Sequence, residues 1–127
     1  MMSTLLLHEP SLQVLPSLAV NIGLHEAIVL HRLHEKLSSV HPRDFVHGRS
    51  WVVSSYNDWQ QEFPFWPVKI LKRIFLSLER QNLVVRERLS GKPSVYRMQY
   101  SISYDHFPGL KEALDVSDHS LTGRSKR

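Results

Sequence analysis

The chain has 127 residues, of which 42% are hydrophobic and 22% are charged, with five glycines and seven prolines, and these values are typical of one globular domain with its own core. It contains no cysteine, which excludes a disulfide scaffold, a thiolate zinc finger, an iron–sulfur site and a cysteine nucleophile, and fits a reducing cytosol. The longest apolar runs, Leu5–Leu7 and Ala27–Leu30, are far too short for a membrane span, and no signal-peptide pattern is present. We therefore expect a soluble, cytoplasmic protein without a membrane partner.

Positive charge is concentrated in one part of the sequence. The net charge is +4, yet residues 1–66 carry four lysines and arginines against six carboxylates. Residues 67–104 carry eight against two, and residues 105–127 carry four against four. Such a concentration is typical of a surface that binds a polyanion, and a solvated basic face is the alternative.

The first half of the chain predicts two helices, a loop and a strand. A short helix over residues 17–22 is ended by Gly23, which easily supplies a left-handed cap. Residues 24–37 have apolar side chains around most of a helix, so this helix should be central and largely buried. Residues 38–48 have no periodicity and predict a loop, and Trp51–Val53 predicts a short strand.

Two further helices should follow, joined by an aromatic turn. Ser55 and Asp58 have the spacing of an N-cap and its acidic partner, which predicts a helix ending near Glu62. Prolines in the segment 63–67 break that helix, and Pro67 suits the first turn of the next one. From Pro67 to Gln81 the apolar residues fall on one side, namely Ile70, Leu71, Ile74, Phe75 and Leu78. The opposite side holds Lys69, Lys72, Arg73, Leu76 and Arg80.

A β-hairpin is expected after this basic helix. Asn82 can take the left-handed cap, and residues 83–89 and 95–104 predict strands around a turn at 90–94. The second strand alternates between an apolar and a polar face. Helix, tight turn, basic helix and hairpin, with the strand at Trp51 as a third strand, is the order of a winged helix-turn-helix. The predicted fold class is therefore α+β, mainly α with a small antiparallel β-sheet.

Two blocks of residues resemble the sequence of a known protein family. The first is Leu12–Val20 with Ile22–Leu30, and the second runs from Trp51 through Tyr56, Trp59 and Phe63–Trp66 to Ile70, Arg73, Ile74, Leu78, Glu79, Gln81 and Leu83. They resemble the N-terminal winged-helix domain of replication initiator and replisome-organiser proteins of phages and integrative elements, the DnaD-like N-terminal class, over residues 5–104. The resemblance implies a cytoplasmic DNA-binding domain that helps assemble replication machinery at an origin, often as a dimer or larger assembly.

The sequence departs from that class in two places. Only about 23 residues follow the hairpin, so the second domain that meets the helicase or its loader is not expected. Pro67 stands where the class often has a serine cap, so the first contacts of the recognition helix should differ. We expect a winged-helix domain over residues 1–104, a short helix or extension over 105–116 and a disordered polar tail over 117–127.

The histidines were compared with the spacings of metal and catalytic sites. Neither His25-Glu26 nor His34-Glu35 has a histidine three positions after the glutamate, so the zinc-protease spacing is absent. His31 and His34 share a helix face, but a zinc site would need His41, His47 or a distant carboxylate, and ordinary buried or interface histidines are the favoured interpretation. The sequence also lacks a Gly-x-Ser-x-Gly elbow and a phosphate-binding glycine loop. We expect no enzyme activity, no metal and no cofactor.

Double-stranded DNA is the expected partner. The predicted contacts come from the basic helix (Lys69, Lys72, Arg73, Arg80), from the hairpin (Arg86, Arg88, Lys92, Arg97) and from Trp66 at the start of the helix. Arg73 should bond a guanine edge, whereas the hairpin arginines should contact phosphates. The other aromatic residues near the turn should serve packing rather than base stacking. The alternatives are a winged-helix module that docks a replisome protein, or a small transcriptional regulator, and a homodimer is compatible with each.

Overall fold

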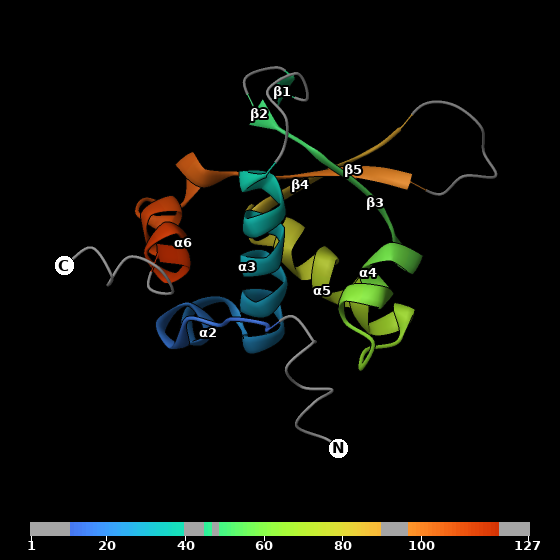
Figure 1. Ribbon diagram of the computed structural model, residues 1–127, viewed down its shortest axis with the longest axis horizontal. Coiled ribbons are helices and arrows are strands. Elements are labelled where there is room, and N and C mark those ends of the chain that lie inside the picture. Colours follow the sequence, from blue (N-terminus) through green and yellow to red (C-terminus); the bar gives the residue numbers. More distant parts are fainter. Residues whose placement is uncertain (1–10, 40–44, 47–48, 90–96, 120–127) are drawn as a thin grey trace.

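A computed structural model of the chain describes residues 11–39, 45–46, 49–89 and 97–119. The fold is α+β, with helices packed around a small three-stranded antiparallel sheet (Figure 1). The helices are α2 (Pro16–Ile22), α3 (Leu24–Ser38), α4 (Tyr56–Glu62), α5 (Val68–Arg80) and α6 (Leu110–His119), with a 3-10 turn η2 at Tyr104–His106. The strands are β1 (Phe45–Val46), β2 (Arg49–Ser50), β3 (Val52–Ser55), β4 (Val84–Arg88) and β5 (Arg97–Ile102).

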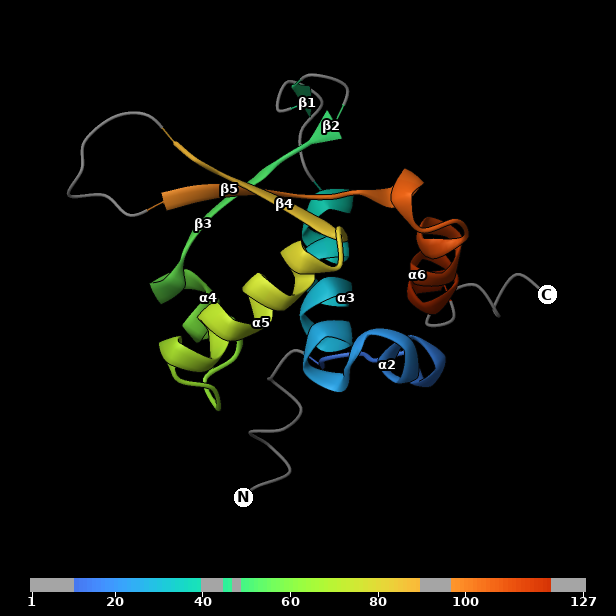
Figure 2. The ribbon, with the colours of Figure 1, turned by 180° about the vertical axis from the view of Figure 1, so that it is seen from behind.

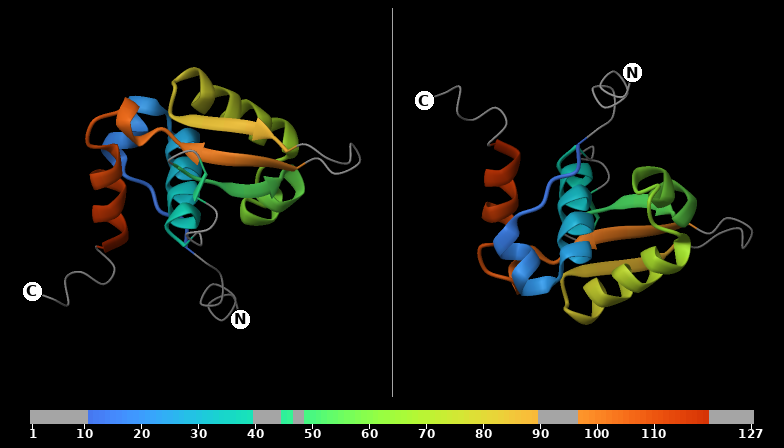
Figure 3. Two further views of the ribbon diagram at one scale, coloured as in Figure 1. Left: turned by 90° about the horizontal axis from the view of Figure 1, so that it is seen from above. Right: turned by 90° about the horizontal axis from the view of Figure 1, so that it is seen from below.

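The sheet has the strand order β3-β5-β4. β5 lies in the middle, with Val52 opposite Tyr100 on one side and Val84 opposite Ile102 on the other. The prediction that the strand after the first loop joins the hairpin is confirmed, although this strand runs over Val52–Ser55 rather than from Trp51. Figure 3 shows the three strands side by side, with α5 along the β4 edge.

Part of the expected loop over residues 38–48 is paired. β1 and β2 form a two-stranded antiparallel ribbon in which Phe45 lies opposite Ser50. Strands of two residues are too short to show the alternation that identifies a strand in a sequence. Residues 40–44 and 47–48 lie outside the described residues.

Three predicted helix ends are confirmed. Gly23 separates α2 from α3 with φ of 112°, a backbone conformation that favours glycine. At the start of α4 the amide of Asp58 donates to Ser55 Oγ (3.1 Å) and the amide of Ser55 donates to the Asp58 carboxylate (3.2 Å), which completes a capping box. Asn82 has a positive φ of 61° directly after α5. Pro67 is the N-cap of α5 rather than its first helical residue.

α3 is the central helix, as predicted: α2, α5 and α6 pack against it, and α4 packs against α5 (Figures 1 and 2). Its residues Ala27, Val29, Leu30 and Leu33 are fully buried. Leu24 differs from the expectation, because it lies in the first turn of the helix and is 54% exposed. The rest of the core comes from α2, α4, α5, the sheet and α6, and its largest side chains include Trp59, Phe63, Phe75, Tyr100, Leu71, Leu78 and Leu110.

The core continues beyond residue 104, where the winged-helix domain was expected to end. Leu110 and Leu114 of α6 are buried in the same apolar cluster as α3. α6 also runs to His119, past the expected start of the disordered tail at residue 117, while residues 120–127 lie outside the described part of the chain. None of the helices in the described ranges is long and apolar enough to cross a membrane.

Candidate nucleic-acid interface

α5 has one buried and one cationic face. Leu71, Ile74, Phe75 and Leu78 are buried against the rest of the molecule. The opposite face consists of Lys69, Lys72, Arg73, Leu76 and Arg80, and each of these residues is exposed. Figure 2 shows α5 on the near side of the molecule, below the sheet. The predicted rotation of the helix is therefore confirmed, and its cations face solvent.

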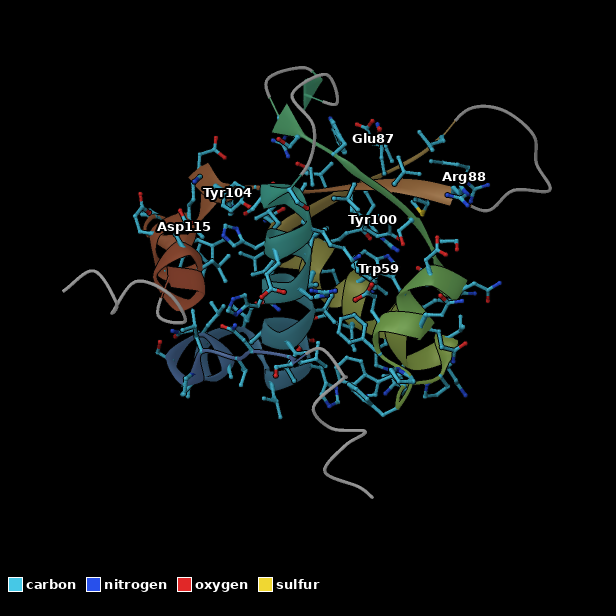
Figure 4. All side chains as sticks on the ribbon, in the orientation of Figure 1. Trp59, Glu87, Arg88, Tyr100, Tyr104 and Asp115 are labelled. Atoms are coloured by element: carbon cyan, nitrogen blue, oxygen red, sulfur yellow. The ribbon has the colours of Figure 1, made fainter. Side chains whose placement is uncertain are left out.

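The hairpin contributes two more exposed cations. Arg88 is the last residue of β4 and Arg97 is the first residue of β5. Arg88 lies opposite Met98, whereas Arg97 lies opposite Ser55, so the alternation of side chains places the two arginines on different faces of the sheet. Figure 4 shows Arg88 near the end of the sheet that is farthest from α6. The hairpin residue Lys92 lies outside the described residues.

Tyr56 connects α5 to this end of the sheet. It follows Ser55, the β3 residue that lies opposite Arg97. The Nζ atom of Lys72 lies 5.6 Å from the centre of the Tyr56 ring, and the Tyr56 hydroxyl accepts a 2.6 Å hydrogen bond from Arg86 Nη1. Tyr56 therefore links Lys72 of α5 to Arg86 of β4, next to the end of the sheet where Ser55 lies opposite Arg97.

Arg86 does not belong to the exposed set, although the sequence suggested a phosphate contact. Its Nη2 atom lies 2.8 Å from the Glu79 carboxylate, and its side chain is only 11% exposed. Burial would lower the pKa of Arg86, but the hydrogen bonds to Glu79 and Tyr56 outweigh burial and raise the pKa. The guanidinium also lies 5.5 Å from the Phe75 ring centre. Arg86 therefore joins β4 to α5, and Glu79 neutralises its charge within the protein.

The exposed cations of α5 and the hairpin differ from other cations of the protein in having no carboxylate partner among the described residues. Arg32 and Lys36 both bind Glu62, at 2.7 and 3.0 Å, and Lys111 binds Asp115 at 3.1 Å. No ion pair to another described residue is formed by Lys69, Lys72, Arg73, Arg80, Arg88 or Arg97. Their charge is available to an external anion.

Most of the aromatic residues near the turn serve packing, as expected. Trp59 and Phe63 are fully buried, with their rings stacked 6.2 Å apart. Trp66 is partly exposed at the start of α5, and its ring lies 4.9 Å from that of His25. Phe65 differs from the expectation, because 57% of it is exposed and its ring touches Trp66 edge-on. The turn therefore presents two aromatic rings beside the basic helix.

His31 and His34 are both buried in the core. The Nε2 atom of His34 lies 2.8 Å from the Asp115 carboxylate, and its Nδ1 atom lies 2.8 Å from the Tyr104 hydroxyl. Because a carboxylate only accepts, Nε2 carries the proton, and in the neutral ring Nδ1 accepts from Tyr104. Among the residues with described positions, no group of three potential metal ligands is found. His41 and His47, the other suggested ligands, lie outside that set.

Comparison of the chain with models of protein families, with curated proteins and with solved structures finds no match. The resemblance to the replication-initiator class therefore stays a prediction. The fold is a small α+β fold in which the helix α5 presents exposed cations that have no carboxylate partner in the described part of the chain, and two further cations lie at one end of the sheet.

Proposed function

We propose that the protein binds duplex DNA through a winged helix-turn-helix. In this proposal α4 and α5 are the helix pair, Phe63–Pro67 is the turn, and β4 and β5 are the wing. The observation that carries the proposal is the outward face of α5, where Lys69, Lys72, Arg73 and Arg80 are exposed and have no carboxylate partner among the described residues. A recognition helix needs cations on its outward face, because the groove is lined by phosphates.

The dimensions of α5 suit this role. Its 13 residues give a helix about 20 Å long at 1.5 Å per residue, and a major groove about 12 Å wide admits an α-helix. Lys69 and Arg73 lie one turn apart on the exposed face. The planar fork of Arg73 can bond the O6 and N7 atoms of guanine, whereas a lysine offers a single point charge. Arg73 is therefore our candidate for base recognition.

The hairpin cations have a different role in the proposal. Arg88 and Arg97 lie at one end of the sheet, on different faces of it, and in this proposal they contact phosphates next to the groove. Such contacts position a protein on DNA without selecting a sequence. Trp66, which is partly exposed at the start of α5, can contact the sugar–phosphate backbone of the DNA.

We further propose that binding serves replication initiation or replisome assembly of a phage or mobile element, and this part rests on the resemblance alone. A role as a protein-interaction module is the second candidate function. Leu76, at 42% exposure, is the large apolar residue on the outward face of α5, and its neighbours there are cations. This composition favours a polyanion over an apolar partner surface.

Selection of duplexes from a random pool, followed by competition binding, tests the assignment. Arg73→Ala should weaken binding to the selected site by about 1 to 3 kcal/mol and leave non-specific binding almost unchanged. Arg88→Ala should weaken both by similar factors. Lys111→Ala, on the distant helix α6, is the control and should change neither.

Two results would contradict the proposal. If Arg73→Ala left the ratio of specific to non-specific affinity unchanged while Arg88→Ala abolished it, the hairpin would be the reading element. If the wild-type protein bound no duplex above the level of the denatured protein, the interaction-module function would replace DNA binding.

A further inference from the structure

A cavity lies apart from α5, because none of its described lining residues belongs to that helix. It has a volume of about 280 Å³ and is bordered by the end of α3, β2, the end of β5, η2 and the first turn of α6. In Figure 1 this region lies at the upper left, between the β1–β2 ribbon and α6. Its apolar wall includes Leu37, Ile102 and the Tyr104 ring. A cavity of this size and lining suits a small molecule with an apolar body.

Several polar groups of the wall are already paired, and these pairs fix its shape. The His34 ring is held between Tyr104 and Asp115, at 2.8 Å on each side. Lys111 binds the other oxygen of Asp115 at 3.1 Å, and the Ser38 hydroxyl donates to the His34 carbonyl oxygen. The cavity therefore has a preformed wall where α3, η2 and α6 meet.

Arg49 is the exception in this wall. Its Nη1 atom is buried, yet it makes no hydrogen bond to any residue that the structure describes. The guanidinium lies 6.0 Å from the centre of the buried Trp51 ring, so its stem is packed and its charged end borders the cavity. A buried donor without an acceptor is costly, and native proteins rarely retain one without a reason.

Arg49 also carries the unpaired charge of the lining. The described lining residues include two cations, Arg49 and Lys111, and Lys111 is already paired with Asp115. Arg49 has no carboxylate partner among the described residues. Arg86 also has a buried nitrogen without a hydrogen bond, but its guanidinium is packed near the rings of Phe75 and Tyr100 rather than beside a cavity. Arg49 therefore combines an unused donor, a positive charge and adjacent space.

We propose that this cavity binds a small organic carboxylate. The carboxylate would accept hydrogen bonds from Arg49, and the apolar body of the ligand would lie against Leu37, Ile102 and Tyr104. Arginine forms strong, charge-assisted bonds of this kind, because two of its N–H groups match the two oxygens of a carboxylate. The site is separate from the α5 face and does not depend on the DNA-binding proposal.

Titration of the full chain with benzoate, followed by the backbone amide spectrum in NMR, tests this proposal. Benzoate should give saturable shifts at Arg49, Ser50, Ser101 and Ile102, with a dissociation constant on the order of 1 mM, as suits so small a ligand. Benzamide has the same ring without the charge and should bind at least about tenfold more weakly, since bonds to a charged group contribute more than neutral ones.

Variants distinguish a specific contact with Arg49 from an effect of the net positive charge of the protein. Arg49→Gln should weaken benzoate binding at least about tenfold, and Arg49→Lys should retain part of the affinity. Arg97→Gln removes an exposed cation elsewhere on the sheet and should bind like the wild type. The amide spectrum of each variant reports whether it is folded, and the comparison of benzoate with benzamide needs only the wild-type protein.

Three outcomes would overturn the proposal. These are the absence of saturable shifts around the cavity, equal binding of benzoate and benzamide, and equal losses in Arg49→Gln and Arg97→Gln. Each can occur whether or not the protein binds DNA, so failure of this site and failure of the proposed function are distinguishable.

Discussion

Truncation of two residues on α5 tests the orientation of the helix on which the proposed DNA contact depends. Ile74 is 2% exposed and lies in the core, whereas Leu76 is 42% exposed on the cationic face. Ile74→Ala removes buried methyl and methylene groups and leaves a cavity, which usually costs about 2 to 5 kcal/mol. Leu76→Ala removes side-chain atoms that already touch water and leaves no closed cavity, so its cost should be about 1 kcal/mol or less.

Urea denaturation followed by circular dichroism measures both costs. Small proteins unfold with slopes of about 2 kcal/mol per molar urea, so Ile74→Ala should lower the midpoint by roughly 1 to 2.5 M. Leu76→Ala should lower it by well under about 1 M at the same slope. Equal shifts for the two variants, or a larger shift for Leu76→Ala, would mean that a different face of α5 points outward and would refute the arrangement of cations described above.

Two further predictions concern other parts of the fold. Gly23→Ala should destabilise by more than about 1 kcal/mol and lower the melting temperature, because φ is 112° there and a residue with a side chain is strained in that conformation; an unchanged melting temperature would contradict the positive φ at Gly23. Burial would raise the pKa of Glu62, but hydrogen bonds from Arg32 and Lys36 outweigh burial and lower the pKa. The stabilisation by Glu62 is therefore complete above its unfolded pKa of about 4.3 and is lost as the pH falls through the lower folded value. Glu62→Gln should be less stable than the wild type near neutral pH and should approach it in acid, and a difference that is constant with pH would contradict the ion pairs.

Local signals in the sequence were sufficient for much of the fold. The buried face of α5 could be predicted from apolar residues spaced three and four apart, since only the face that carries them can pack against the core. Ser55 and Asp58 identify the start of α4, because both residues of the capping box lie within four consecutive residues of the chain. Gly23 and Asn82 identify turns of the backbone, since few other residues adopt a positive φ at low cost.

Features that depend on distant contacts were not predictable in the same way. Arg86 was grouped with the other hairpin cations, because its partners Glu79 and Tyr56 are brought to it only by the packing of α5 and α4 against the sheet. The sequence likewise placed the domain end at residue 104, because Leu110 and Leu114 are too few to reveal that α6 completes the core. The free donor of Arg49 becomes apparent only when the lining of the cavity is known.

The salt dependence of duplex binding, measured by fluorescence anisotropy of a labelled duplex, tests the proposed DNA contact most directly. The exposed cations without a carboxylate partner among the described residues are Lys69, Lys72, Arg73, Arg80, Arg88 and Arg97. If these six reach phosphates, each releases about 0.9 counterion, so the plot of log affinity against log salt should have a slope near −5. Affinity that stays constant between low and moderate salt would contradict binding through this surface.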